Sequence, residues 1–214
     1  MVIAIDGPAG AGKSTVARRV AQILKIQYLD TGAMYRAFTY FVLQHDIDLN
    51  NLEAINKLLD GFEITFRDQR VYIGDTEVAA EIRSDSVTDT VSYISSLRAV
   101  RKKMVELQRE IGKNRSVVAE GRDIGTVVFP ETNHKFYLDA SIKERARRRI
   151  GDKKNQSKIT DINEIQRKIR QRDEYDSTRE ISPLTKAPDA HYLDTTHMTI
   201  DEVCNHIITH VNEV

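Results

Sequence analysis

The chain lacks several features that would each point to a particular class of protein. Among its 214 residues there is one cysteine, so no disulfide within the chain and no cysteine-based zinc cluster can form. Lys and Arg together number 32, as do Asp and Glu, and the resulting zero net charge differs from the basic balance typical of nucleic-acid-coating proteins. Neither an internal repeat nor a low-complexity segment is present. We therefore expect a globular protein without a nucleic-acid partner.

Long apolar runs are also missing. No run approaches the roughly 20 residues of a transmembrane helix. Asp6 and the glycines after it interrupt the first apolar run too early for a signal peptide. We therefore expect a cytoplasmic protein without a membrane partner. Cys204 falls in an apolar-periodic helix expected over 200–211, where a small packing role is the simplest interpretation.

Residues 7–14, with the sequence GPAGAGKS, are the most informative stretch. They follow the apolar run Val2–Ile5 and fit the phosphate-binding pattern G-x-x-x-x-G-K-[ST]. In this pattern backbone N–H groups cradle phosphate oxygens, Lys13 reaches the β- and γ-phosphates, and the Ser14 hydroxyl binds Mg²⁺. A glycine-rich turn without a ligand is the alternative, but a strand before and an amphipathic helix after favour phosphate binding. We predict that ATP is held by Gly7, Pro8, Ala9, Gly10, Ala11, Gly12, Lys13, Ser14 and Thr15.

The remaining pattern predicts an α/β fold. Five short apolar runs, mostly separated by helical patterns, indicate buried parallel strands at 2–5, 28–29, 116–119, 135–138 and 191–193. Several of them end in an acidic residue, namely Asp6, Asp30, Glu120, Asp139 and Asp194. Ligands in such sheets bind at the carboxyl ends of strands, which makes these carboxylates candidates for metal or substrate contacts. Glu120 stands where a carboxylate could hold Mg²⁺ through water.

Residues 62–78 interrupt the alternation of strands and helices. Alternating apolar residues, with turns at 68–69 and 74–75, predict a small antiparallel meander. Because so small a sheet is unstable alone, we expect an insert packed on the parallel domain. The helix predicted next, over 97–112, carries an apolar stripe that indicates core packing: Leu97, Val100, Met104, Leu107 and Ile111.

Residues 145–158 are crowded with positive charge. One interpretation is a solvated helix face that runs into a loop. The other is a mobile cationic lid that closes over phosphates, which the phosphate-binding motif favours because closure excludes water. On the second interpretation, the catalytic arginines are Arg145, Arg148 and Arg149, which act together with Lys13 on the charge of the transferred group.

Three further motifs contain arginines, at 30–36, 120–123 and 172–179. Arg172, Asp176 and Arg179 are spaced i, i+4 and i+7, as on one face of a helix. Each arginine alone could form an ordinary surface ion pair. Together with the phosphate-binding motif, they predict a second, anionic substrate opposite the triphosphate.

These motifs resemble those of bacterial cytidylate kinases, a branch of the nucleoside monophosphate kinases. The resemblance covers essentially the whole chain and rests on GPAGAGKST at 7–15, LDTGAMYR at 29–36, EIR at 81–83, EGRDIGTVVFP at 120–130, FYLDAS at 136–141 and RDEYDSTREISPL at 172–184. It implies a phosphate-loop (P-loop) NTPase fold. That fold has a five-stranded parallel sheet flanked by helices, an antiparallel β insert in the monophosphate-binding region and a mobile lid.

The resemblance also implies an activity and a set of ligands. The activity is Mg²⁺- and ATP-dependent phosphorylation of CMP and dCMP to their diphosphates, in pyrimidine nucleotide metabolism. Family positions that hold the monophosphate correspond to Thr31, Arg36, Ser92, Arg101, Arg122, Asp123, Arg172, Asp176 and Arg179. Of these, Ser92, Arg101 and Asp123 would read cytosine. Arg36, Arg122 and Arg172 would hold the phosphate, and Asp176 and Arg179 would lie by the sugar.

We expect one kinase domain over 1–214, acting as a monomer. Its parts are a core (1–30, 114–145 and 160–214), a monophosphate-binding region (31–113) and a lid (146–159). Two alternatives stay open from the residues alone. One is a kinase for another small acceptor, such as UMP or shikimate, and the other is a non-catalytic phosphate-loop switch that signals through a partner.

Overall fold

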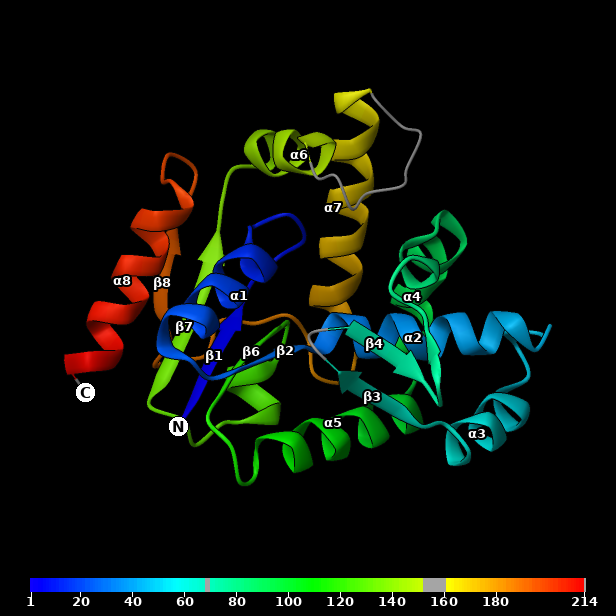
Figure 1. Cartoon of the computed structure of the whole chain (residues 1–214). Helices are drawn as coiled ribbons and strands as arrows, with labels where there is room; N and C mark the ends of the chain where they lie inside the picture. Colours follow the sequence, from blue (N-terminus) through cyan, green and yellow to red (C-terminus); the bar gives the residue numbers. More distant parts are fainter. Residues whose placement is uncertain (68–69, 152–160, 214) are drawn as a thin grey trace.

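The computed structural model describes residues 1–67, 70–151 and 161–213. Its centre is a five-stranded parallel sheet with the strand order β2-β6-β1-β7-β8 (Figure 1). The strands are β1 (Val2–Asp6), β2 (Gln27–Asp30), β6 (Val117–Gly121), β7 (His134–Asp139) and β8 (His191–Asp194). The predicted α/β class and its five parallel strands are confirmed.

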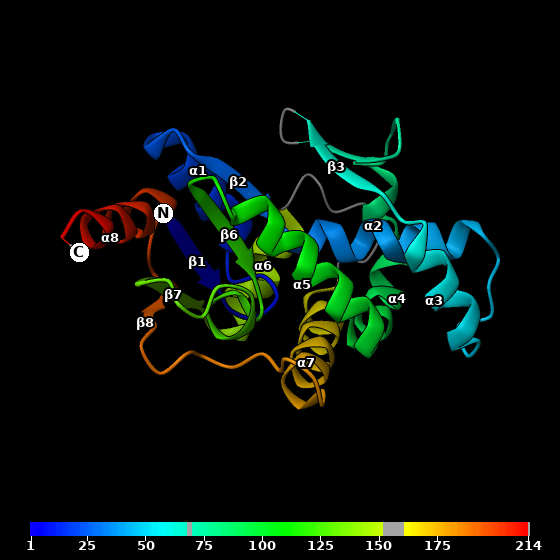
Figure 2. The same ribbon diagram turned by 90° about the horizontal axis from the view of Figure 1, so that it is seen from below.

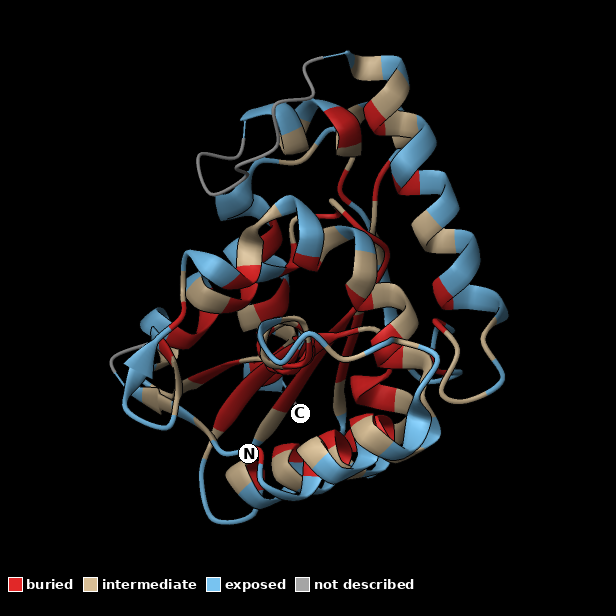
Figure 3. Ribbon diagram, turned by 90° about the vertical axis from the view of Figure 1, so that its right-hand side faces the viewer, coloured by how far each residue is buried: buried red, intermediate tan, exposed pale blue. Residues whose placement is uncertain are grey.

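Helices cover both faces of the parallel sheet. Ile3 and Ile5 of β1 pack in one apolar cluster with α1 (Lys13–Leu24) and α8 (Ile200–Glu213). Ala4, between them, belongs to a second cluster with α5 (Arg98–Gly112). This alternation follows from the strand period of two, which sends successive side chains to opposite faces. Buried on both faces, the central strands read as continuous apolar runs; Figure 3 shows them enclosed by helices with exposed outer sides.

The three-stranded meander is confirmed as a separate antiparallel sheet. It consists of β3 (Ile64–Arg67), β4 (Arg70–Ile73) and β5 (Thr76–Glu77). Its turn at 68–69 lies outside the described residues. The meander lies beside α2 (Thr31–Gln44) and α3 (Leu52–Asp60), at the end of the molecule away from α8 (Figures 1 and 2). The 3-10 turn η1 (Glu81–Arg83) and α4 (Asp85–Ser96) follow.

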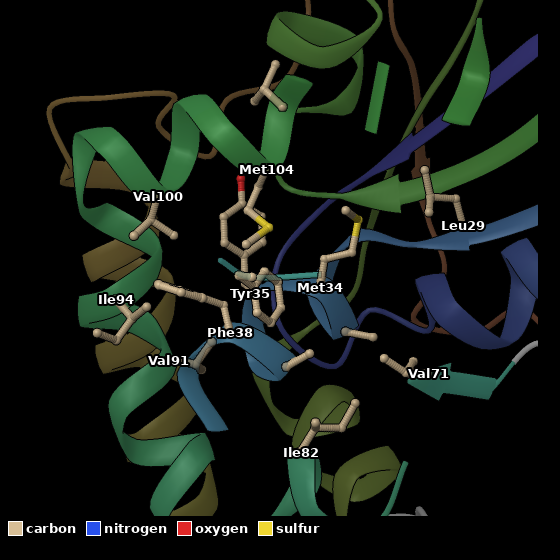
Figure 4. Packing of buried hydrophobic residues seen from close by; sticks show 14 of the residues in the cluster. Leu29, Met34, Tyr35, Phe38, Val71, Ile82, Val91, Ile94, Val100 and Met104 are labelled. Atoms are coloured by element: carbon tan, nitrogen blue, oxygen red, sulfur yellow. The ribbon is translucent and has the colours of Figure 1, made fainter. Parts of the chain in front are cut away.

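A core inside this outer region surrounds α2. Met34 and Phe38 of α2 are fully buried among side chains from α4 and α5 (Figure 4). Val100 and Met104 of α5 are also fully buried, while Leu97, Leu107 and Ile111 pack against the cluster as partly buried residues. The apolar stripe predicted for the 97–112 helix is therefore a core face.

Two sequence expectations about the far side of the sheet have different outcomes. Cys204 is 1% exposed within α8, as expected of a packing residue. The expectation that 191–193 forms a buried strand is wrong, because His191, Tyr192 and Asp194 are exposed. These side chains are exposed because β8 is the edge strand of the sheet, where β7 is its one neighbour among the described strands.

Two further helices, α6 (Ile142–Gly151) and α7 (Ile162–Thr178), lie between β7 and β8 in the chain. α6 and α7 pack against each other above the carboxyl ends of the strands (Figure 1). Between them, the part of the predicted lid at 152–159 lies outside the described residues. None of the helices in the described ranges is long and apolar enough to cross a membrane.

Candidate functional site

The phosphate loop (residues 7–15) connects β1 to α1 at the carboxyl edge of the sheet. Gly10 and Gly12 adopt φ values of 80° and 91°, which only glycine takes up without strain. Gly7 has φ 146°, and a Cβ added to it would lie 2.0 Å from the backbone oxygen of Leu138 in β7. Glycine at this position is therefore required by packing as well as by conformation.

Lys13, the first residue of α1, is buried at the mouth of this loop. Its Nζ donates a hydrogen bond of 2.7 Å to the Pro8 carbonyl oxygen, inside the loop. Burial, reinforced by the positive charge of Arg122, lowers the pKa of Lys13 to about 7. Anionic phosphate oxygens close to Nζ would favour its charged form, which suits a group that binds triphosphate.

Ser14 and Glu120 offer a pair of oxygen ligands next to Lys13. The Ser14 hydroxyl donates a 2.6 Å hydrogen bond to Glu120 Oε1 at the end of β6, and the Tyr28 hydroxyl approaches the same oxygen at 3.3 Å. Burial, followed by the charge of Asp30, raises the pKa of Glu120. Mg²⁺ in phosphotransferases is commonly bound by a hydroxyl or carboxylate together with substrate phosphates, and this donor set fits it.

Asp6, at the end of β1, was expected to be a candidate metal or substrate ligand. Its carboxylate instead accepts two backbone hydrogen bonds, from Ile124 N at 2.8 Å and from Gly125 N at 2.7 Å. Burial raises the pKa of Asp6 to about 7 against the opposing effect of these two bonds. Asp6 thus anchors the turn η2 (Ile124–Val128), which directly follows Arg122 and Asp123.

Six of the predicted acceptor-binding residues are brought into one region. Arg122 Nε lies 2.9 Å from Asp176 Oδ2, and Arg101 forms a short ion pair with Asp123. Arg179 connects the two pairs, at 3.8 Å from each carboxylate. Arg172 lies 3.9 Å from Asp176. We refer to Arg101, Arg122, Arg172, Arg179, Asp123 and Asp176 as the arginine cluster.

The arginine cluster carries more positive than negative charge and leaves buried donors unused. Its four guanidinium groups face two carboxylates, and burial together with the charge of Arg122 lowers the pKa of Arg172 to about 10. Within the described residues, the buried atoms Arg101 Nε, Arg172 Nε and Arg179 Nη2 make no hydrogen bond, and the last two face carboxylates only at ion-pair distances of 3.9 and 3.8 Å. Buried donors without partners are rare in native proteins, so these atoms indicate a ligand with acceptor oxygens or nitrogens.

One expectation about this cluster is wrong in detail. Arg179 does not continue the helical face of Arg172 and Asp176, because α7 ends at Thr178 and Arg179 has the extended angles φ −62° and ψ 143°. Its side chain still turns back, and its Nε donates to the Ser182 carbonyl at 2.8 Å. The three side chains therefore meet as expected although the backbone differs.

A cleft of about 270 Å³ runs between α4 and α7 to the phosphate loop. Its walls include Ser92 and Arg172 of the predicted acceptor site, Arg149 of α6 and Ala9 of the phosphate loop. Arg101 is 2% exposed and does not line this cleft. The cleft thus joins the two predicted substrate sites, and Arg101 forms part of the structure behind it.

Thr31 and Arg36 approach the site from α2. The Asp30 side chain caps α2 by accepting from Ala33 N at 2.8 Å. The Thr31 hydroxyl is buried and donates to the Glu120 carbonyl at 2.7 Å. Arg36 donates to Thr88 Oγ1 at 3.0 Å, and Thr88 lines the cleft.

The arginines of α6 lie against the phosphate loop. Arg145 Nη1 donates to the Ala9 carbonyl at 3.0 Å and pairs closely with Asp173, whereas Arg148 binds both oxygens of Thr195, at 3.0 and 2.6 Å. These two arginines lie on a helix, and their side chains contact the phosphate loop and the residue that follows β8. Their predicted catalytic role and that of Arg149 remain predictions.

Sequence reasoning missed Asp173 of α7. Its Oδ1 accepts a hydrogen bond of 2.9 Å from Ala9 N, while Arg145 holds the Ala9 carbonyl. The available signal was its place directly after Arg172 in the motif at 172–179. The i, i+4, i+7 pattern selected Arg172, Asp176 and Arg179, and Asp173 lies about 100° round the helix from Arg172, so it received no role.

Comparisons with known proteins agree with this geometry. The family model described as Cytidylate kinase matches residues 3–213. A cytidylate kinase of Acholeplasma laidlawii is 48% identical over 206 residues, which cover 96% of this chain and 92% of the relative. One from Clostridioides difficile is 45% identical over 212 residues, covering 99% and 98%. A shikimate kinase structure from Bacteroides thetaiotaomicron shares the fold, with a TM-score of 0.53, 14% identity and coverage of 100% and 99%.

Proposed function

The chain belongs to the cytidylate kinase family, and on that premise we propose that it transfers the γ-phosphoryl group of ATP to CMP and dCMP. The products are ADP and CDP or dCDP. The observation that carries the proposal is the arginine cluster, because Arg172, whose buried Nε has no hydrogen-bond partner in the described residues, lines a cleft that reaches Ala9 of the phosphate loop. Such a cluster suits a second anionic substrate, which a nucleotide switch would not need.

The site residues divide between the two substrates. We propose that the phosphate loop holds ATP, with Lys13 close to its β- and γ-phosphates. Arg36, Arg122 and Arg172 would hold the CMP phosphate. The other acceptor-binding residues would bind the nucleoside: Thr31, Ser92, Arg101, Asp123, Asp176 and Arg179. Mg²⁺, held by Ser14 and through water by Glu120, would supply charge neutralisation at the β- and γ-phosphates.

The proposed reaction is an in-line displacement without a general base. A phosphate monoester has a second pKa of about 6, so the CMP oxygen is already anionic at neutral pH. This oxygen forms the new bond to the γ-phosphorus, while the bond to the β,γ-bridging oxygen breaks and its electron pair leaves with ADP. The protein mainly positions the two phosphates and neutralises charge, for which we propose Lys13, Arg145, Arg148 and Arg149.

The proposed division of the chain follows the two substrate sites. Residues 31–113 would bind the monophosphate, 146–159 would act as the lid, and the remaining segments would form the core around ATP. Closure with both substrates present would keep water from the γ-phosphoryl group. We further propose that the protein acts as a monomer in the cytoplasm.

A coupled assay of ADP formation tests the proposal. It uses ATP and Mg²⁺ with CMP, dCMP, UMP, AMP, GMP or shikimate as the acceptor. We expect strong turnover with CMP and dCMP and slow ATP hydrolysis without an acceptor. Best turnover with UMP or shikimate would replace the proposed acceptor. Brisk ATP hydrolysis independent of any acceptor would contradict the transfer reaction.

A further inference from the structure

Arg101, a predicted base-reading residue, is held on several sides by its surroundings. Its Nη2 pairs closely with Asp123, and its Nη1 donates to the Ser95 carbonyl at 3.2 Å. Its Cζ lies over the ring of Tyr35, 5.1 Å from the ring centroid. The ion pair and the hydrogen bond hold two of the guanidinium nitrogens, and the ring of Tyr35 covers the group.

The hydroxyl of Tyr35 is buried and faces the Gln108 side chain. The residue is 7% exposed, and in the described part of the chain its hydroxyl has no hydrogen-bond partner. The ring lies in the apolar cluster around α2, beside Met104 of α5 (Figure 4). Burial raises the pKa of the hydroxyl above its usual range, so the residue is neutral. The ring is therefore the part of Tyr35 that acts on Arg101.

We propose that Tyr35 is a positioning residue that sets the base selectivity of the acceptor site through the guanidinium of Arg101. The proposal rests on the proposed function and concerns the pair Arg101 and Asp123. In this pair, Arg101 Nε is a donor without a hydrogen-bond partner in the described residues, and the Asp123 carboxylate is an acceptor. Cytosine offers an amino donor at N4 beside an acceptor at N3, whereas uracil offers an acceptor at O4 beside a donor at N3.

The plane of the guanidinium decides whether that discrimination works. A guanidinium donates only in its own plane, so a tilt would move its donors away from N3 of the base. The Tyr35 ring opposes the tilt by a cation–π contact, and such contacts are strongest where water is excluded. Arg101 is 2% exposed, so water is excluded here. Loss of the ring would weaken selectivity for cytosine and leave the phosphate loop unchanged.

The kinetic test compares three variants on CMP and UMP. Tyr35→Leu removes the ring, Tyr35→Phe keeps it, and Phe38→Leu removes a ring from the same helix and core. Phe38 is fully buried, and its ring contacts Phe62 at 5.0 Å between centroids, so this variant controls for lost packing. We expect the ratio of kcat/KM for CMP to that for UMP to fall about fivefold to tenfold in Tyr35→Leu. The ratio should stay at the parent value in the other two variants, and KM for ATP should be unchanged in all three.

Unchanged selectivity in Tyr35→Leu, or an equal loss in Phe38→Leu, would overturn the proposal. Replacement of Tyr35 by pentafluorophenylalanine covers the case in which Tyr35→Leu does not fold, because it keeps the ring shape and inverts the ring quadrupole. Lower selectivity in that protein than in Tyr35→Phe supports the proposal, and equal selectivity contradicts it.

A readout without turnover separates this proposal from the proposed function. The NMR signal of the Arg101 Nε–H should be shifted upfield by the ring in the parent and in Tyr35→Phe. That shift should be lost in Tyr35→Leu and kept in Phe38→Leu. A shift that survives in Tyr35→Leu would overturn the positioning role. A parent protein that shows the shift but does not phosphorylate CMP would contradict only the proposed function.

Discussion

Asp173 on α7 accepts a hydrogen bond from the backbone amide of Ala9 in the phosphate loop, at 2.9 Å. Its neighbour Arg172 and, one turn later, Asp176 belong to the arginine cluster. The helix that carries predicted ligands of the acceptor is therefore attached directly to the loop that is predicted to hold the donor. Arg145 completes this attachment by binding the Ala9 carbonyl at 3.0 Å.

The first prediction concerns this attachment. Asp173→Ala leaves the Ala9 amide without its acceptor and Arg145 without its ion-pair partner. We expect kcat/KM for ATP to fall about tenfold to a hundredfold, because small displacements of positioned groups are costly in transfer reactions. Loss of the partly buried partner should also lower the free energy of unfolding by about 2–3 kcal/mol. Steady-state kinetics and urea denaturation measure the two effects. The adjacent exposed residue supplies the control, Glu174→Ala, and equal effects in both variants would refute the attachment.

The second prediction concerns Lys13, whose Nζ lies inside the phosphate loop. We expect Lys13→Ala to reduce kcat by a factor of about 10² to 10³, as is typical when a preorganised charge at a transition state is removed. KM for CMP should change little, because Lys13 is assigned to the donor. Lys57→Ala on α3 is the matched control at a remote site. Turnover of Lys13→Ala within tenfold of the parent would show that the assigned role is wrong.

The third prediction concerns Ser14 and Glu120, whose oxygens lie 2.6 Å apart. Ser14→Ala removes the hydroxyl and should raise the Mg²⁺ concentration at half-maximal activity by about tenfold. Titration of activity with Mg²⁺ at saturating CMP measures this directly. Ser116→Ala, at the other end of β6, should leave the titration unchanged. An unchanged Mg²⁺ requirement in Ser14→Ala would remove Ser14 from the metal site.

The fourth prediction concerns Asp6 and pH. Burial raises the folded-state pKa of Asp6 from 3.8 to about 7, so between these values the folded chain binds a proton that the unfolded chain lacks. The bound proton adds to the free energy of unfolding. This contribution is fully present below about pH 4 and is lost as the pH rises through 7, at about 1 kcal/mol per pH unit. Asp6→Asn should therefore remove a decline in unfolding free energy between pH 5 and 7. Urea denaturation at several pH values measures the slope. The exposed carboxylate of Asp75 supplies the control, Asp75→Asn, and a slope equal to the parent in Asp6→Asn would contradict the prediction.

Local sequence signals were sufficient for the fold. Continuous apolar runs located the five parallel strands, because a strand buried on both faces is apolar throughout. Alternation with a period of two located the meander, because a strand buried on one face is apolar at every second residue. The exposure of β8 was missed, since the short run His191 to Leu193 reads alike in an edge strand and a central strand. The end of α7 was missed as well, because neither glycine nor proline directly follows Thr178.

Contacts between distant segments explain the rest of the differences. The motifs contained the residues of the arginine cluster, but some of their pairs join distant positions, such as Arg122 and Asp176, which are 54 residues apart. Ala9 and Asp173 are even farther apart in the sequence. Their hydrogen bond also involves a backbone amide, which no side-chain pattern reveals. Charge alone could not distinguish a lid arginine from Arg145, which binds the phosphate loop.

The close approach of Gly7 to Leu138 limits which amino acids position 7 can accept in a library of variants. A side chain at position 7 would have to enter the space already occupied by the backbone oxygen of β7, 2.0 Å from the new carbon. Backbone cannot give way as a flexible side chain can, so even alanine is excluded. In a saturation library selected for growth, position 7 should tolerate as few replacements as position 13, although it supplies no side chain. Intolerance to mutation would thus mark both a residue with a catalytic side chain and a residue that has no room for a side chain, and only the structure tells them apart.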